Sequence, residues 1–145
     1  RWWPSRAHLL LALYSRAKNT LTQPETGSFS GDLTEYLTSM VRQWQGGRAG
    51  MGQIFRLLIA EAQMDPAVSE AVMRERQERW HHIDTIVAKA QARGDATLSV
   101  SHVRIEHRII SMMWYLLLTD QLPAEAEVPG LVRDLLADLG GTLSP

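Results

Sequence analysis

Residues 32–45 read DLTEYLTSMVRQWQ, and this stretch carries the clearest fold signal in the chain. Its large apolar side chains recur every three or four residues, which places them within an arc of about 140° on an α-helix. They are Leu33, Tyr36, Leu37, Met40, Val41 and Trp44. The spacing of Asp32 and Glu35 is compatible with a capping arrangement, and Gly46-Gly47 ends the pattern. The stretch is therefore predicted to form an amphipathic helix that begins at Asp32.

The same periodicity recurs on both sides of this stretch. No window of useful length alternates with period two, and no solenoid repeat or low-complexity tract is present. Five further helices are predicted at residues 5–18, 49–63, 65–93, 99 or 101 to 121, and 129–139. Asp65-Pro66 is typical of a helix start, Gly94 of a helix end, and Pro123 of a point that a helix cannot pass. The predicted fold class is all-α, a bundle of about six helices.

Composition narrows the function classes. The chain has 145 residues, 45% of them hydrophobic, a net charge of −1 and no Cys, which suits one globular domain without disulfides or thiolate metal sites. No apolar run is long enough to span a membrane. The balanced charge argues against bulk electrostatic binding of nucleic acid. The charge is unevenly placed, however, because all 16 acidic side chains lie at or after Glu25, whereas four of the 15 basic ones precede it.

The last two predicted helices are more apolar than a small monomer needs. Apolar side chains of the fifth helix cover about 240° of its circumference, and those of the sixth form another wide stripe. Two such helices from each of two chains would make a four-helix bundle across a two-fold axis. The alternative is that the fifth helix is central and buried by its own neighbours. The residues predicted for a dimer interface are Ile105, Ile109, Met112, Tyr115, Leu116, Thr119, Leu131, Val132, Leu135, Leu136 and Leu139.

Methionine and aromatic side chains are concentrated on several helices. Methionine fills irregular space adaptably, and aromatic rings offer flat faces to apolar or cationic ligands, so a cavity for a small, mostly apolar effector is predicted. Its predicted lining is Met40, Trp44, Phe55, Leu58, Met64, Trp80, Ile83, Glu106, His107, Ile110, Met113 and Trp114. Each of these residues has an alternative role in an ordinary core, and Glu106 has one as a structural residue near a helix start. The charged run at residues 74–79 is expected to face solvent.

Motifs for catalysis and metal binding are not found. The sequence has no Gly-x-Ser-x-Gly, no P-loop and no dinucleotide fingerprint. His81 and His82 are adjacent, so they cannot chelate a metal from one face of a helix, and the sequence has no His-x-x-x-His spacing. No catalytic residue, metal or cofactor is predicted.

Four stretches resemble one family of bacterial regulators. Residues 1–10, RWWPSRAHLL, resemble the segment that closes the DNA-binding domain of tetracycline-repressor-like (TetR-family) proteins. Residues 25–33 (ETGSFSGDL), 92–95 (ARGD) and 113–119 (MWYLLLT) resemble parts of a subgroup of its C-terminal domains. The resemblance implies a cytoplasmic, homodimeric one-component regulator, in most cases a repressor. An N-terminal helix-turn-helix in such proteins binds operator DNA, and the C-terminal domain dimerises and holds a small effector.

The resemblance also assigns parts of this chain. It implies that residues 1–4 end the DNA-binding domain and that residues 5–145 form the effector-binding and dimerisation domain. Trp3 falls at the aromatic position after the recognition helix, and Arg6 where a basic side chain meets a DNA phosphate. A start at Arg1 without Met is typical of a fragment, so the helix-turn-helix itself is expected upstream. The other classes left open are a helical interaction module without regulatory function and an enzyme with an apolar pocket.

Overall fold

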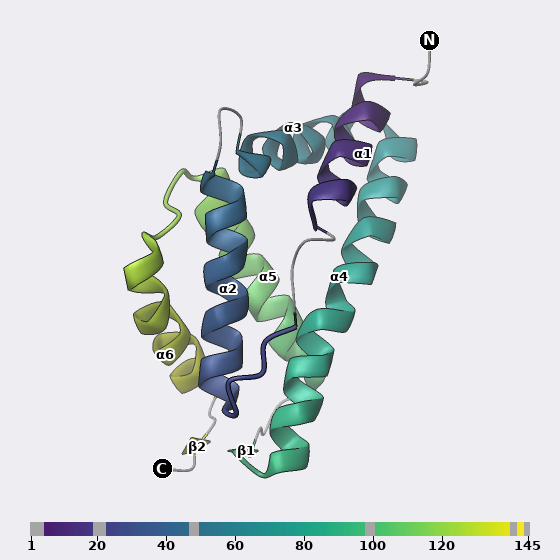
Figure 1. Ribbon diagram of the computed structural model, residues 1–145. Coiled ribbons are helices and arrows are strands. Elements are labelled where there is room, and N and C mark those ends of the chain that lie inside the picture. The colour runs from purple at the N-terminus through teal and green to yellow at the C-terminus, as the bar shows by residue number, and fades with distance from the viewer. Residues whose placement is uncertain (1–4, 19–22, 47–49, 98–100, 140–141, 144–145) are drawn as a thin grey trace.

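The computed structural model describes residues 5–18, 23–46, 50–97, 101–139 and 142–143, and nearly all of them are helical (Figure 1). The elements are α1 (Arg6–Lys18), α2 (Phe29–Gln45), α3 (Met51–Met64), α4 (Pro66–Arg93), β1 (Ala96–Thr97), α5 (His102–Leu118), the 3-10 turn η1 (Glu125–Glu127), α6 (Val128–Asp138) and β2 (Thr142–Leu143). Strands β1 and β2 pair antiparallel over two residues each. The prediction of an all-α fold with six helices is confirmed.

Helix α2 lies at the centre of the arrangement. Helix α4, the longest, runs along one side of the molecule, α5 lies between α2 and α4 in the view of Figure 1, and α6 packs on the far side of α2. Helix α3 crosses one end of the bundle, where α1 packs against α3 and α4. The predicted apolar face of α2 is buried against these neighbours, with Leu33, Leu37 and Val41 fully enclosed. Burial of such a face, rather than helix propensity, supplies most of a helix's stability.

Several predicted helix boundaries agree with the structure. Asp65 precedes α4 in an extended conformation, and its carboxylate accepts a hydrogen bond from the Ala67 N–H at 2.9 Å, with Pro66 in the first turn. Gly94 ends α4 at φ +73°, in the left-handed region that glycine enters without steric cost. Helix α5 ends at Leu118 and not at Gln121 as predicted, because the chain turns at Asp120, where φ is +59°.

The predicted start of α2 at Asp32 is wrong. The helix begins three residues earlier, and Ser28 is its N-cap, with a side-chain oxygen that accepts the Gly31 N–H at 3.1 Å. A Cβ on Gly31 would collide with the Thr26 hydroxyl, so the incoming chain folds closely over the first turn. Serine and aspartate are both good N-caps, and sequence spacing alone does not choose between them.

Asp32 instead belongs to an ionic cluster, which we call the α2 anchor (Thr26, Asp32, Arg93 and Asp95) and of which Asp32 is the buried member. Its carboxylate accepts hydrogen bonds from the Thr26 N–H at 2.7 Å, the Thr26 hydroxyl at 2.8 Å and the Arg93 guanidinium at 3.0 Å. Asp95 accepts from the Phe29 N–H at 2.8 Å and from Arg93. The anchor thus joins the start of α2 to the end of α4.

The anchor holds Asp32 in its ionised form. Burial alone would raise the pKa of this fully enclosed carboxyl, but the hydrogen bonds from Thr26 and Arg93, together with the Arg93 charge, outweigh burial and lower the pKa. Charge-assisted hydrogen bonds of this kind are shorter and stronger than neutral ones. The stability of the anchor therefore depends on the charges of its side chains and on the directions of its hydrogen bonds. The stretches at 25–33 and 92–95, which carry part of the family resemblance, meet at this anchor.

Candidate ligand-binding cavity

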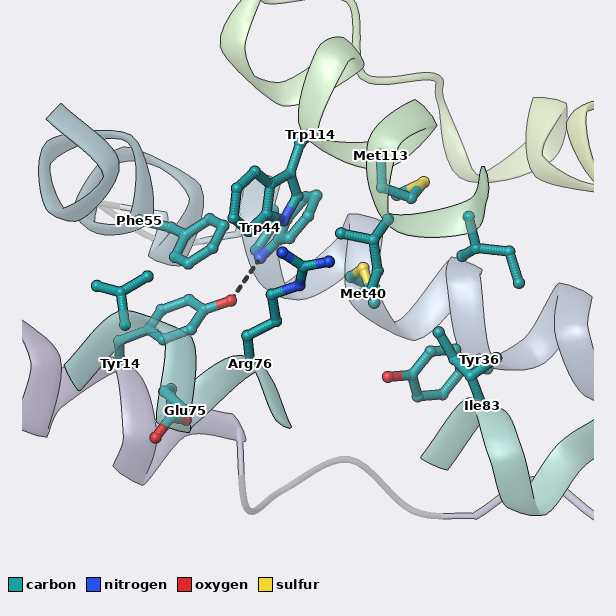
Figure 2. Close-up of a pocket in the computed structure, with 13 residues that line it drawn as sticks. Tyr14, Tyr36, Met40, Trp44, Phe55, Glu75, Arg76, Ile83, Met113 and Trp114 are labelled. Atoms are coloured by element: carbon teal, nitrogen blue, oxygen red, sulfur yellow. Dashed lines mark hydrogen bonds between the residues drawn. The ribbon is translucent and has the colours of Figure 1, made fainter. Parts of the chain in front are cut away.

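A cavity lies where five helices meet (Figure 2). Helix α1 contributes one residue to its wall, α3 one, α2 three, and α4 and α5 four each. The lining residues are Tyr14, Tyr36, Met40, Trp44, Phe55, Val72, Glu75, Arg76, Ile83, Ile109, Ile110, Met113 and Trp114. All but Glu75 and Arg76 are apolar or aromatic. Such a lining, with few polar groups, is typical of small-molecule sites.

The cavity is contracted in this conformation. The free space within it is about 40 Å³, and it reaches about 490 Å³ only when the crevices between side chains and the open mouth are included. Free space of 40 Å³ is close to the volume of one water molecule in the liquid, about 30 Å³, whereas sites for drug-sized ligands enclose about 300 Å³ or more. An organic ligand must therefore move side chains apart as it enters. Met40 and Met113 suit this movement, because methionine is flexible and adapts its shape.

Stacked aromatic rings form one wall and connect four helices. The Phe55 ring of α3 lies 4.6 Å from the Tyr14 ring of α1, nearly parallel to it, and 5.9 Å from the Trp44 ring of α2. Trp114 of α5 meets Phe55 edge-on at 5.4 Å. The Trp44 indole N–H donates a long hydrogen bond of 3.4 Å to the Tyr14 hydroxyl. Displacement of this wall therefore reaches α1, because the buried Tyr14 is part of it.

Two charged side chains of α4 also line the cavity. The Arg76 guanidinium lies 5.5 Å from the centre of the Trp114 ring, a cation–π arrangement. Partial burial lowers the pKa of Arg76, and the negative charge of Glu106 opposes that effect. In Figure 2 the Arg76 side chain extends between Met40 and the two tryptophans, whereas Glu75 points away from them.

The predicted pocket residues fall into two groups. Seven of the twelve line the cavity, namely Met40, Trp44, Phe55, Ile83, Ile110, Met113 and Trp114. Four of the other five, Leu58, Met64, Glu106 and His107, do not line it in the structure. Leu58 is fully buried in the core, Met64 is 85% exposed at the end of α3, and the side chain of Trp80 lies outside the described part of the structure.

Glu106 and His107 are the remaining two predicted pocket residues. Glu106 is buried but lies outside the cavity wall, and His107 is exposed beside a groove between α5 and α6. Burial raises the pKa of Glu106, the charge of Asp84 adds to this rise, and the neighbouring histidines 107, 102 and 81 oppose it. Glu106 thus lies outside the cavity wall and, because it is buried, does not face solvent near the helix start either.

The sequence-based prediction missed six lining residues, namely Tyr14, Tyr36, Val72, Glu75, Arg76 and Ile109. Tyr14, Tyr36 and Val72 were in phase on the inner faces of their helices, so their positions carried a usable signal. Glu75 and Arg76 did not, because they belong to the charged run that was expected to face solvent. Residues 75 and 76 are only half-exposed, since the long α4 turns this part of its surface toward Trp114.

The residues predicted for a dimer interface also occupy different environments. Ile105, Ile109, Val132, Leu135, Leu136 and Leu139 are buried in the chain's own core. Met112, Leu116 and Leu131 are half-buried, while Tyr115 and Thr119 are exposed, Tyr115 by 59%. The predicted face was too wide, because the 240° apolar arc of α5 includes the side that packs inside the bundle. The outward faces of α5 and α6 flank a groove lined by His107, Arg108, Ser111, Met112, Leu131, Asp134, Leu135 and Asp138.

Within the described residues, no group of three or more His, Asp or Glu side chains is arranged to hold a metal ion. No helix in the described ranges is both long and apolar enough to cross a lipid bilayer. Arg6, implied by the resemblance as a phosphate contact, is the first residue of α1 and is exposed, whereas Trp3 lies outside the described residues.

A solved structure shares this fold. The crystal structure of TetR family transcription regulator SCO0332 matches with a TM-score of 0.78 and 26% sequence identity, over 94% of this chain and 75% of that chain. The fold of the bundle is thus of the class found in transcription regulators.

The model of the tetracyclin repressor-like C-terminal domain family matches residues 23–136, and no curated protein matches the chain. The chain belongs to this family of C-terminal domains. The family recognised from the sequence is confirmed, and it is a family of transcription regulators rather than of enzymes.

Proposed function

We propose that this chain is the effector-binding and dimerisation domain of a cytoplasmic one-component transcriptional repressor. A helix-turn-helix on the N-terminal side of α1 binds the operator, and a small effector in the cavity weakens that binding. The observation that carries the proposal is the position of Tyr14. This side chain of α1 is buried in the cavity wall, where it stacks on Phe55 and accepts the hydrogen bond of Trp44.

The mechanism is a shift between two arrangements of the helices. A ligand that fits only an expanded cavity binds the expanded arrangement better, and it shifts the population by that difference in affinity. Expansion moves the aromatic wall and, through Tyr14, the helix that leads to the DNA-binding segment. The two DNA-binding domains of a dimer must match half-sites about one DNA turn apart, so a small displacement of α1 lowers operator affinity.

The test measures operator binding by the full-length protein with and without compounds that raise its Tm. We expect each such compound to weaken operator binding and, by thermodynamic linkage, the operator to weaken compound binding by the same factor. Tyr14→Leu should reduce this coupling, whereas Leu13→Ala, at an exposed position of the same helix, should retain it. Compounds that bind the dimer and leave operator affinity unchanged would contradict the proposal.

Substitution of Arg6 gives a second, independent test of DNA binding. Its exposure at the start of α1 suits contact with a backbone phosphate, which positions a protein without reading sequence. Arg6→Ala should therefore weaken binding to operator and to unrelated DNA alike, with a salt dependence lower by about one ion. A loss confined to the operator sequence would count against this role.

The proposed homodimer forms through the outward faces of α5 and α6. Tyr115 and Leu118 are large, exposed apolar side chains on α5, and Met112 and Leu131 line the groove beside them. Light scattering coupled to size exclusion should give twice the mass of one chain. Tyr115→Glu should yield monomers, whereas Val103→Glu, the same change at an exposed apolar position outside this groove, should not. A monomer of the unmodified chain at micromolar concentration would refute the interface.

A further inference from the structure

The charge inside the cavity bears on the chemistry of the ligand. Eleven of the thirteen lining residues are apolar or aromatic, so the electrostatic character of the site comes from the other two. Of these, Arg76 extends among Met40, Trp44 and Trp114, whereas Glu75 is directed away from them (Figure 2). A ligand seated against the aromatic wall therefore meets a positive charge first.

This charge persists when the surroundings are apolar. An arginine side chain stays protonated in proteins, because even a lowered pKa lies far above neutral. Partial burial lowers the pKa of Arg76, which means that the guanidinium gives up part of its hydration where it lies. The charge of Glu106 on α5 opposes the effect of burial on the pKa of Arg76, and Glu106 itself is buried outside the cavity wall.

Ligand classes differ in how they meet this arrangement. A cationic ligand would face the aromatic rings, which attract it, but would also be repelled by Arg76 at close range. A neutral ligand would gain no attraction from the guanidinium charge. A carboxylate would gain the attraction of opposite charges, and guanidinium geometry suits two parallel, charge-assisted hydrogen bonds to one carboxylate.

We infer that the effector is an amphipathic organic anion, with its carboxylate at Arg76 and its apolar part among the aromatic and methionine side chains of the cavity. This inference rests on the proposed function, because it specifies the ligand class of the same site. It adds a charge to the prediction from sequence, which was a small, mostly apolar effector. The apolar part lies where Met40, Phe55 and Met113 separate to admit it.

The experiment compares ligands that differ only in charge. Titration calorimetry on this chain uses two series, 2-naphthoate with 2-naphthamide and 2-naphthylmethylammonium, and decanoate with decanamide and decylammonium. In at least one series we expect the carboxylate to bind at least about tenfold more tightly than its amide, and the ammonium compound to bind most weakly. If neither carboxylate binds more tightly than its amide, or if neither binds at all, the inference is overturned.

Variants assign the preference to one side chain. Arg76→Gln should abolish the advantage of the carboxylate over the amide while changing amide affinity less than about threefold, and Arg76→Lys should keep part of the advantage. Arg74→Gln is the matched control, because Arg74 lies on the same helix with a side chain 70% exposed and pairs with Glu70 at the surface. A carboxylate preference that survives Arg76→Gln in a variant with the circular dichroism of the parent would overturn the inference.

The outcome is separable from that of the proposed function. Binding of the carboxylate through Arg76 without any effect on operator affinity in the full-length protein would support the ligand class and refute the regulatory mechanism. Release of operator by an amide or an ammonium compound, unaffected by Arg76→Gln, would support the mechanism and refute the ligand class.

Discussion

The two ends of the bundle are stabilised in different ways. At the start of α2, the anchor joins Asp32, Arg93 and Thr26 through hydrogen bonds of 2.7–3.0 Å to a fully buried carboxylate. Near the other end of α2, Trp44 and Met40 lie in an aromatic and methionine wall around contracted free space. Helices α2 and α4 take part in both regions.

The difference indicates which region moves. Charge-assisted hydrogen bonds weaken when their distances and angles leave a narrow range, whereas apolar contacts are not directional and can slide and re-form. We therefore expect cavity expansion to displace the helices at the aromatic end while the anchor keeps the other ends of α2 and α4 together. The predictions below test this contrast, beginning with the largest expected effect.

Asp32→Ala should cost about 2–3 kcal/mol of unfolding free energy, because it leaves the Thr26 hydrogen-bonding groups and part of the Arg93 charge without their acceptor. Urea denaturation measures the loss. Glu70→Ala, which breaks an exposed pair with Arg74, is the control and should leave stability close to that of the parent. Equal losses in the two variants would show that the anchor is no stronger than a surface ion pair.

Gly31→Ala should cost about 1–3 kcal/mol, because the added Cβ collides with the Thr26 hydroxyl, which cannot move without losing its bond to Asp32. The same substitution at Gly130 of α6 has open space around it and should gain up to about 1 kcal/mol through reduced chain entropy. Thermal unfolding of the two variants gives the comparison. A neutral Gly31→Ala would mean that the loop over α2 yields easily.

Met113→Leu in the cavity wall should cost less than about 1.5 kcal/mol, because the volume is nearly conserved and the wall adapts. The urea midpoint should shift little, while affinities for the naphthalene and decyl probes should change. A loss of unfolding free energy as large as that of Asp32→Ala would show that the aromatic end of the bundle is no more adaptable than the anchor.

The two buried carboxyls should respond to pH with opposite signs. The pKa of Asp32 is lowered by folding, so its contribution to stability is present at neutral pH and is lost as pH falls below about 4, and Asp32→Asn should flatten this acid limb. The pKa of Glu106 is raised by burial, so it disfavours the folded state once pH rises above about 4.3. Glu106→Gln should therefore raise Tm at neutral pH and leave it unchanged near pH 4. A Glu106→Gln variant less stable than the parent at neutral pH would assign that carboxylate a stabilising partner.

Local signals in the sequence were sufficient for most of the fold. Helical periodicity and the short-range chemistry of Asp65-Pro66 and Gly94 depend on neighbours in the chain, and the structure has the helices that they predict. The start of α2 was misplaced because the role of Asp32 depends on Arg93, 61 residues away. A residue suited to two local roles takes the one that its distant partners favour.

The candidate cavity was predictable only in part, for a related reason. Apolar side chains in helical phase point inward, so residues such as Met40 and Met113 reach the centre in any packing of these helices. A charged run is ordinarily solvated, and nothing near Arg76 in the sequence shows that α5 will place Trp114 beneath it. Met64 is an apolar residue that was predicted to line the cavity but is exposed, since it lies at the end of α3, beyond the packed part of the bundle.

The contracted cavity has a consequence for the speed of ligand binding. Free space of about 40 Å³ cannot receive an organic molecule, so entry must wait for an opening of the aromatic wall. When a rare open form is the one that binds, the observed association rate levels off at high ligand concentration, at the rate of opening. The apparent affinity is then lower than that of the open form by the fraction of molecules that are open. The response of the protein to a ligand would therefore be no faster than the opening of the wall.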